Sequence, residues 1–288
     1  MTTPLRFALF GNVYQHAKSA AIAQVLECLH RHHARIFIDD EYCDFLRCSE
    51  LIDPGVDVET FTGSDFEADF AISMGGDGTF LRAAGRVGAK QMPILGVNMG
   101  RLGFLADVAP KDVAQGIDAL CAGDYSVEER AVIAVSTGAY ALNDVAILKR
   151  DTASMISIRT TINGEYLTTY QADGVIVSTP TGSTAYSLSN GGPIIVPGTN
   201  VFSLTAVAPH SLNVRPIVIP DSAVLELTVS SRSHSFLVAT DGCSEKLPEG
   251  TTIRISRAPY NVRVVKRVGQ QYFATLREKM MWGADTRE

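Results

Sequence analysis

Residues 70–84 read Phe-Ala-Ile-Ser-Met-Gly-Gly-Asp-Gly-Thr-Phe-Leu-Arg-Ala-Ala, and this stretch sets the architecture of the first part of the chain. Its apolar beginning, 70–74, predicts a buried strand, and its end, 80–84, predicts the start of a helix. Three glycines around one acid form the turn between them, where backbone can approach a ligand closely. The following helix would point free N–H groups and its positive dipole end at that turn. We therefore predict a phosphate site on Gly75, Gly76, Gly78 and Thr79, with the carboxylate of Asp77 beside it.

Strand and helix signals alternate around this stretch, from residue 1 to about 124. The apolar runs 6–10, 35–38 and 93–97 predict further strands, and Ile22, Val25, Leu26 and Leu29 have the spacing of one helix face. Such alternation predicts parallel βαβ units with helices on both faces of the sheet. Ligands bind beyond the carboxyl ends of the strands in these sheets. We expect a Rossmann-like parallel α/β domain over 1–124, with the glycine turn at its ligand-binding edge.

The apolar pattern changes to a period of two from residue 125 onward. Asn163-Gly164 separates two strand-like runs and is a strong hairpin signal. The spacing of the runs predicts a mostly antiparallel β-sandwich domain over 125–268. The last segment, 269–288, returns to a helical pattern, and we expect it to pack on the α/β domain.

One polar segment interrupts the β-rich region. Residues 179–189 read Thr-Pro-Thr-Gly-Ser-Thr-Ala-Tyr-Ser-Leu-Ser, and six of these eleven residues are Ser or Thr. The segment is too polar for a core, and its hydroxyls and its aromatic ring suit a nucleotide; a capped turn is the alternative. Two acids lie near it in the sequence, in Asn143-Asp144 and Asp173-Gly174, and each is either a turn former or part of the same site.

Composition narrows the range of partners. The chain has 288 residues and a net charge of −6, with no basic stripe, which argues against nucleic acid as a partner. No run of apolar residues approaches the length of a membrane span. Five cysteines occur without Cys-x-x-Cys spacing, which favours reduced thiols in a cytoplasmic protein.

The motifs together resemble the ATP-NAD kinase family. The resemblance rests on Gly-Gly-Asp-Gly-Thr at 75–79, Gly103-Phe104-Leu105, Asn143-Asp144, and the run from Asp173-Gly174 to Tyr186. The glycine-aspartate turn alone also occurs in lipid kinases of the diacylglycerol kinase type and in phosphofructokinases, whereas its combination with Thr-Pro-Thr-Gly-Ser-Thr-Ala-Tyr is specific.

This resemblance implies a function and a set of site residues. The family transfers the γ-phosphoryl group of ATP, or of polyphosphate in some members, to the 2′-hydroxyl of the adenosine ribose of NAD. Asp77 matches the catalytic proton acceptor, and Gly78 lies against the dinucleotide. The family also implies a homo-oligomer, a tetramer or a dimer. The further NAD-binding positions implied by the match are Asn143, Asp144, Asp173, Thr184, Ala185, Tyr186, Ser187, Leu188, Ser189 and Ala208.

The phosphate charge must be neutralised without a P-loop, because the chain lacks a Gly-x-x-x-x-Gly-Lys-Ser/Thr motif. A divalent metal, Mg²⁺ by preference, and Arg82 or Arg101 are the candidates; the sequence does not identify the metal ligands. Arg82 lies one helical turn past the glycines, where it faces either the phosphates or solvent.

Two departures from the family pattern stand at Gln171, where many relatives have a basic residue, and at Cys243, where many have glutamine. Two other functions remain open at this point: a lipid kinase, and a non-catalytic NAD(P)-binding sensor. The stretch Gly100 to Phe104 differs from the lipid-kinase pattern.

Overall fold

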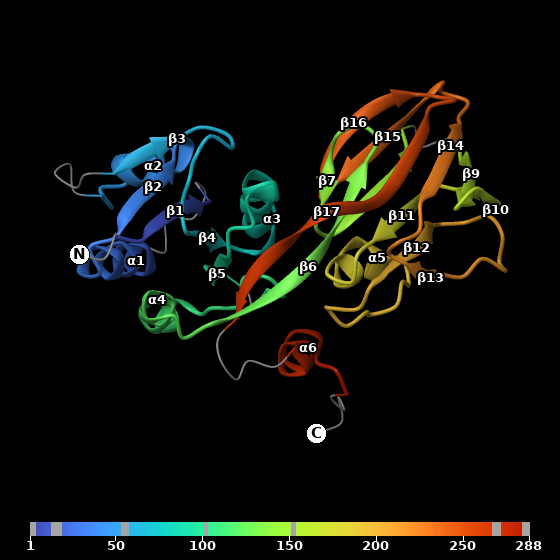
Figure 1. Cartoon of the computed structure of the whole chain (residues 1–288). Helices are drawn as coiled ribbons and strands as arrows, with labels where there is room; N and C mark the ends of the chain where they lie inside the picture. Colours follow the sequence, from blue (N-terminus) through green and yellow to red (C-terminus); the bar gives the residue numbers. More distant parts are fainter. Residues whose placement is uncertain are drawn as a thin grey trace. The chain divides into compact units, whose positions relative to one another are not determined.

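The computed structural model describes residues 4–12, 19–52, 58–100, 103–150, 154–266 and 272–283 (Figure 1). The chain forms two compact units, one of residues 1–129 with 262–288 and the other of residues 130–261. Strands β6 (Ser126–Val135) and β17 (Thr252–Lys266) each contribute residues to both units. The first boundary therefore falls inside a strand, whereas the sequence pattern places it at 124/125.

The first unit is built on a parallel sheet. Its strands follow the order β17-β5-β4-β1-β2-β3, and every pairing along that path is parallel. The α/β fold predicted from the sequence is confirmed. The strands are β1 (Arg6–Gly11), β2 (Arg35–Asp39), β3 (Glu59–Phe61), β4 (Phe70–Gly75), β5 (Ile94–Asn98) and the end of β17, and the helices are α1 (Ser19–Arg31), α2 (Asp40–Cys48), α3 (Asp77–Val87) and α4 (Val113–Ala122).

Helices cover both faces of this sheet because side chains alternate along each strand. On β5, Leu95 belongs to the core cluster that includes the apolar faces of α1 and α4. The next residue, Gly96, faces Phe80 of α3. Helices α3 and α4 therefore pack on opposite faces of β5, and α3 begins directly at the carboxyl end of β4, as the glycine turn requires.

The second unit holds two sheets of antiparallel strands. One follows the order β10-β9-β14-β17, with β6 paired to β17 and β7 paired to β6, and the other follows β13-β12-β11-β8-β15-β16. The two sheets share one apolar core, which confirms the predicted β-sandwich. Its further elements are β7 (Tyr140–Ala141), β8 (Asp144–Lys149), β9 (Ile156–Ile162), β10 (Glu165–Ala172), β11 (Gly174–Ser178), α5 (Tyr186–Ser189), β12 (Val201–Val207), β13 (Ile217–Pro220), β14 (Leu225–Ser230), β15 (Ser235–Thr240) and β16 (Cys243–Pro248).

The Asn163-Gly164 hairpin is confirmed. It joins β9 and β10, with φ values of 52° and 83° at the two turn residues. A two-residue turn with positive φ at both positions matches the twist of antiparallel strands, and asparagine and glycine tolerate that conformation best.

The C-terminal helix α6 (Tyr272–Met280) belongs to the first unit. Its buried residue is Leu276. Across the described ranges, no helix combines the length and the apolar character that crossing a membrane requires.

Candidate active site

The glycine turn connects β4 to α3, and the helix begins earlier than the sequence pattern predicts. Helix α3 starts at Asp77, with Gly76 as its N-cap, so Asp77, Gly78 and Thr79 form its first turn. The expected start at Phe80 is therefore wrong. An acidic residue in the first turn is favoured by the helix dipole, which offsets the poor helix propensity of the glycine beside it. The Thr79 N–H donates to the Gly76 carbonyl oxygen at 3.0 Å, whereas the N–H groups of Asp77 and Gly78, at the very start of the helix, have no acceptor within it.

The glycines of the turn serve different purposes. A Cβ on Gly75 would lie 2.2 Å from Oγ1 of Thr79, so internal packing demands glycine there. A Cβ on Gly76 or Gly78 would meet no atom within 4 Å. The fold does not need glycine at these two positions, and the free space beside them is open to a ligand.

The Asp77 carboxylate is held by the loop that follows β5. Its Oδ1 accepts N–H groups of Leu105 and Ala106, both at 3.0 Å, and its Oδ2 accepts the Phe104 N–H at 2.9 Å. Lys279 of α6 donates to Oδ2 at 3.3 Å. The carboxylate therefore has one fixed orientation, set by backbone groups.

These donors also decide the charge of Asp77. Burial would raise the pKa of its carboxyl, but the N–H groups of Phe104 and Ala106, the Lys279 ammonium and the Leu105 N–H outweigh it. The net effect holds the pKa below its usual value, so Asp77 is ionised at neutral pH.

Gly103 makes this arrangement possible. A Cβ on Gly103 would lie 2.1 Å from Asp77 Oδ1 and 2.9 Å from the Ala106 carbonyl oxygen. Only glycine lets the loop close over the carboxylate at this distance. The Gly103-Phe104-Leu105 motif therefore has a structural role, because its Phe104 and Leu105 N–H groups donate hydrogen bonds to the Asp77 carboxylate.

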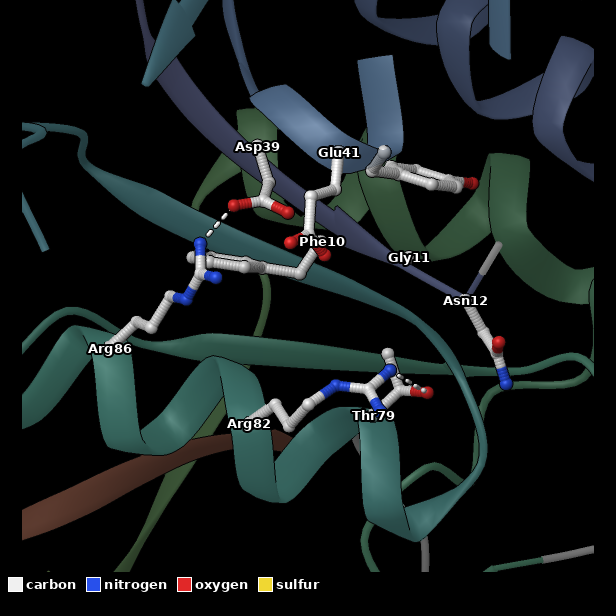
Figure 2. Close-up of a pocket in the computed structure, with 9 residues that line it drawn as sticks. Phe10, Gly11, Asn12, Asp39, Glu41, Thr79, Arg82 and Arg86 are labelled. Carbon is white, nitrogen blue, oxygen red and sulfur yellow. Dashed lines mark hydrogen bonds and ion pairs between the residues drawn. The ribbon is translucent and has the colours of Figure 1, made fainter. Parts of the chain in front are cut away.

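A pocket of about 230 Å³ lies beside the first turn of α3 (Figure 2). Arg82 and Arg86 extend into it from α3, opposite Asp39 and Glu41. Arg86 forms an ion pair with Asp39, whereas the Arg82 guanidinium approaches Oγ1 of Thr79 at 3.5 Å. The lining residues are Phe10, Gly11, Asn12, Asp39, Glu41, Tyr42, Thr79, Arg82 and Arg86.

Arg82 therefore lines a pocket and is at the same time exposed to solvent. Arg101, the other candidate cation, lies outside the described residues.

In the second unit, Asp241 organises the segment that carries Asn143 and Asp144. Its carboxylate accepts the N–H groups of Leu142 at 2.7 Å, Asn143 at 2.9 Å and Asp144 at 3.1 Å. These three consecutive donors hold the start of β8 in place. The sequence pattern contained no sign of this role, because Asp241 lies almost a hundred residues further along the chain.

Asp144 has an unusual charge state. Burial and the nearby charge of Asp241 raise the pKa of the Asp144 carboxyl to about 7, although the Tyr186 N–H that it accepts opposes the rise. Burial also raises the pKa of Asp241, against its three backbone donors. Two buried carboxyl groups that share a site do not both ionise readily, so Asp144 is partly protonated near neutral pH.

The Ser/Thr-rich segment packs against Asn143. The Thr179 hydroxyl donates to the Leu142 carbonyl at 2.6 Å, and the Thr179 N–H donates to the Asn143 carbonyl at 2.9 Å. A Cβ on Gly182 would lie 2.1 Å from that same Asn143 oxygen, so Gly182 permits the contact. The structure thus brings the 179–189 segment together with Asn143 and Asp144.

The expectation that this segment is too polar for a core is wrong for part of it. Thr179, Thr181, Ser183 and Ser187 are buried. Their hydroxyls have internal partners, such as Thr205 for Ser187 at 3.0 Å, and buried hydroxyls are tolerated when they are hydrogen-bonded. The residues that keep exposed surface are Thr184, Ala185, Tyr186, Leu188 and Ser189.

Asp173 and Ala208 lie together at one end of the β11–β12 pair. The Asp173 N–H donates to the Val207 carbonyl at 2.9 Å, and the Asp173 carboxylate pairs with the Lys149 ammonium at 2.7 Å. Ala208 has a φ of 43°, in the left-handed region. Outside glycine, asparagine and aspartate this conformation is uncommon, and it often marks a functional constraint.

Two residues with important contacts escape the sequence reasoning. Lys279 lies in a helix with no motif of its own, and the sequence pattern assigns no role to Asp241. For Asp241, the one local feature is an acid followed by glycine at the end of a strand-like run. The same feature is typical of an ordinary turn, so it does not predict the contacts of Asp241.

Comparison with known proteins identifies the protein family that the chain matches. The family model described as "ATP-NAD kinase N-terminal domain" matches residues 17–125, and "ATP-NAD kinase C-terminal domain" matches residues 142–267. An NAD kinase of Bacteroides fragilis is 54% identical over 98% of this chain and 100% of the relative. An NAD kinase of Porphyromonas gingivalis is 42% identical over 98% of this chain and 99% of the relative.

Solved structures agree in fold. Yeast NADH kinase complexed with NADH has a TM-score of 0.89 at 20% identity, covering 100% of this chain and 90% of that chain. An NAD kinase from Archaeoglobus fulgidus in complex with ATP has a TM-score of 0.76 at 25% identity, covering 96% of this chain and 99% of that chain.

Proposed function

The chain belongs to the ATP-NAD kinase family, and we propose from that premise which of its residues carry out the reaction. The enzyme transfers a phosphoryl group from ATP to NAD and produces NADP and ADP. The observation that carries our assignment of residues is the ionised Asp77 carboxylate, fixed at the first turn of α3 beside two glycines with open space.

The test of this function is NADP formation from NAD, ATP and Mg²⁺ by the purified chain. We expect turnover that stops when Mg²⁺ is removed with a chelator. NAD binding without any turnover would contradict the assignment and identify a sensor. Turnover of a diacylglycerol in place of NAD would identify a lipid kinase.

Asp77 orients the 2′-hydroxyl of NAD and accepts its proton as the new bond to phosphorus forms. A carboxylate with a lowered pKa is a weak base, but phosphoryl transfer depends on position and charge neutralisation more than on proton abstraction. The N–H groups of Phe104, Leu105 and Ala106 fix the position of the Asp77 carboxylate. The family resemblance and the fixed geometry of Asp77 support the same role.

The donor phosphates bind at the start of α3. The N–H groups of the N-cap residue Gly76 and of Asp77 and Gly78 favour an anion, and Arg82 lies one turn further, in the pocket. Thr79 contributes a hydroxyl next to the Arg82 guanidinium. Gly76 and Gly78 leave open space in which the backbone can approach the phosphates, and Gly75 lets the turn pack closely against Thr79.

Replacing Arg82 with glutamine is expected to raise the KM for ATP by roughly 10–100-fold, because a hydrogen bond to a charged group contributes about 1.5–3 kcal/mol. The KM for NAD should change little. Arg47, which is exposed on α2, provides the matched control, since Arg47→Gln removes the same charge outside the pocket. Equal KM values for ATP in both variants would exclude Arg82 from the donor site.

Replacing Gly78 with alanine separates ligand contact from folding. The new methyl group meets no protein atom, so the thermal stability should stay the same or rise slightly, because alanine favours a helix. Activity should fall by roughly 10–100-fold, since a small displacement of reacting groups has effects of that size. Gly85→Ala on the exposed side of α3 is the control and should keep full activity. An active Gly78→Ala enzyme would mean that no ligand approaches this position.

The second unit binds the adenosine half of NAD. We assign this to Asn143 and Asp144, with Thr184, Ala185, Tyr186, Ser187, Leu188 and Ser189 around the adenine. The support is that Asp144 accepts the Tyr186 N–H and that Tyr186 keeps 39% of its surface exposed. The Ser187 hydroxyl is occupied by Thr205, so Ser187 would contribute through its backbone.

A divalent metal, Mg²⁺ by preference, completes the donor site. Among the described residues there is no group of three or more His, Cys, Asp or Glu side chains that could hold a metal ion. Mg²⁺ does not require such a group, because it is often bound by substrate phosphates and one or two carboxylates. The metal would arrive with ATP and neutralise its phosphates.

We further propose that the enzyme is a homo-oligomer, a tetramer or a dimer, with Asp173 and Ala208 contributing to the NAD site of the assembly. Both residues lie at one end of the β11–β12 pair. Exposed apolar side chains in the second unit, Tyr166, Leu212 and Val218, offer surface for an assembly contact.

A further inference from the structure

Helix α6 reaches the proposed catalytic carboxylate. Lys279, near the end of this helix, donates to Asp77 Oδ2 at 3.3 Å, and its ammonium lies 4.3 Å from the centre of the Phe104 ring. Among the described residues, Lys279 is the charged side chain that contacts Asp77. The two residues are 202 positions apart.

The loop of residues 104–106, which donates hydrogen bonds to Asp77, also packs against α6. The Tyr272 ring at the start of the helix lies 6.3 Å from the Phe104 ring, and Leu276 in the middle of the helix is buried. Phe104 thus contacts both ends of α6 and donates its N–H to Asp77. Lys279 is therefore held near Asp77 by packing and not by the ion pair alone.

The Asp77 carboxylate is fully occupied in this arrangement. A carboxylate offers about four acceptor positions. Two on Oδ1 take the Leu105 and Ala106 N–H groups, and two on Oδ2 take the Phe104 N–H and the Lys279 ammonium. A substrate hydroxyl must replace one of the four donors, and Lys279 is the one that can leave without a change in the backbone.

We propose that Lys279 is a further catalytic residue of the phosphoryl transfer, which leaves Asp77 when the acceptor hydroxyl binds and then contacts the transferred phosphoryl group. The proposal rests on the proposed role of Asp77. In this step the bond from the 2′-oxygen to the γ-phosphorus forms, and the bond from that phosphorus to the β,γ-bridging oxygen breaks. The hydroxyl proton passes to Asp77, ADP leaves, and Lys279 stays protonated throughout.

Distances support this second position of the ammonium. A hydroxyl that donates to Oδ2 lies about 2.7 Å from it, and the phosphorus that it attacks is about 3–3.5 Å further. The ammonium lies 3.3 Å from the same oxygen, so the ammonium and the incoming hydroxyl share one acceptor, and the phosphorus adjoins that hydroxyl. Lysine carries a compact charge on a flexible stem, which suits a cation that changes partners.

The ion pair itself contributes little to the fold. The Lys279 side chain is 30% exposed, and partly exposed ion pairs have small effects on stability. A variant without the charge should therefore fold, so its kinetics report on the reaction.

The experiment compares Lys279→Met with Arg277→Met in the full chain. Arg277 is exposed on the same helix and is not one of the described residues that contact the Asp77 carboxylate. We expect Lys279→Met to lower kcat by roughly 10²–10³-fold, the usual loss for one charge-stabilising donor. Its KM for NAD should stay within about threefold, because the contact exists only during transfer. Lys279→Arg should recover part of kcat, and Arg277→Met should match the wild type.

Three results would overturn the proposal: an unchanged kcat in Lys279→Met, a raised kcat, which would mean that α6 blocks the site, and equal losses in both methionine variants. Melting curves identify a variant that is unfolded, and Lys279→Gln then takes the place of Lys279→Met. The Asp77→Asn variant is measured separately. If it is inactive while Lys279→Met is fully active, the proposal for Lys279 fails and the role of Asp77 stands; an active Asp77→Asn enzyme overturns the role of Asp77.

Discussion

Replacing Asp77 with asparagine is expected to lower kcat by roughly 10²–10⁴-fold, the range that a general base contributes. The asparagine oxygen can still accept N–H groups of the 104–106 loop, so the side chain keeps its place. Its amide carries no charge and cannot accept the hydroxyl proton. The measurement is steady-state NADP formation with saturating ATP, together with the NAD dissociation constant from calorimetry.

Binding and folding provide the internal controls for this variant. The NAD dissociation constant should change by less than about threefold, because the dinucleotide keeps its contacts elsewhere. The free energy of unfolding should fall by about 1–3 kcal/mol, since one backbone N–H or the Lys279 ammonium loses its acceptor. Asp65→Asn, at an exposed position of the same unit, should leave all three quantities unchanged. Near-normal turnover by Asp77→Asn would remove Asp77 from the mechanism.

Replacing Asp144 with asparagine is expected to stabilise the protein at alkaline pH by as much as about 4 kcal/mol. Burial and the charge of Asp241 raise the pKa of the Asp144 carboxyl to about 7, whereas an unfolded chain has an aspartate pKa of about 3.9. Each unit of difference corresponds to about 1.4 kcal/mol. Asparagine carries no charge to bury and keeps an oxygen for the Tyr186 N–H.

The sign of the pH dependence follows from proton binding. Between about pH 4 and pH 7 the folded wild type holds a proton on Asp144 that the unfolded chain has lost, so its stability falls as pH rises through this window. The Asp144→Asn variant has no proton to lose at this position, so its stability does not show this fall with pH. Denaturant unfolding at pH 4 should therefore show little difference between the two proteins, and unfolding at pH 8 should show the full difference.

A second measurement on the same variant tests the proposed adenosine contact. Asp144→Asn should raise the KM for NAD by about tenfold, the loss of one charged hydrogen bond, while it gains stability. A gain in stability together with a loss of substrate affinity is common when a functional residue is replaced. Asp124→Asn, at an exposed turn of the first unit, should alter neither property. A destabilised Asp144→Asn at pH 8 would mean that the carboxyl is ionised in the folded protein at no cost.

Local patterns account for most of the secondary structure. The alternation of strands and helices, the change to a period of two, and the Asn163-Gly164 turn are all present in the folded chain. These features depend on backbone sterics and on the periodicity of apolar residues, which act over a few positions. The one clear error in this region is the start of α3, where a cap residue and the helix dipole outweigh the low helix propensity of glycine.

Burial of polar groups was less predictable. Hydroxyl-rich composition argues against a core, yet Thr179 and Ser187 are buried with partners distant in the chain. Whether a polar side chain can be buried depends on an acceptor being in reach after packing, and composition holds no information about that distance.

The sequence by itself determined the class of fold, the glycine turn and the identity of Asp77 as the acid in it, because each of these follows from neighbours in the chain. The tertiary structure alone decided the surroundings of that acid. Gly103 lets the loop close over Asp77, Lys279 comes from 202 positions away in the sequence, and burial together with Asp241 raises the pKa of the Asp144 carboxyl. A pKa and a hydrogen-bond partner are fixed by burial and by charges a few ångströms away, and only the packed fold brings those groups together.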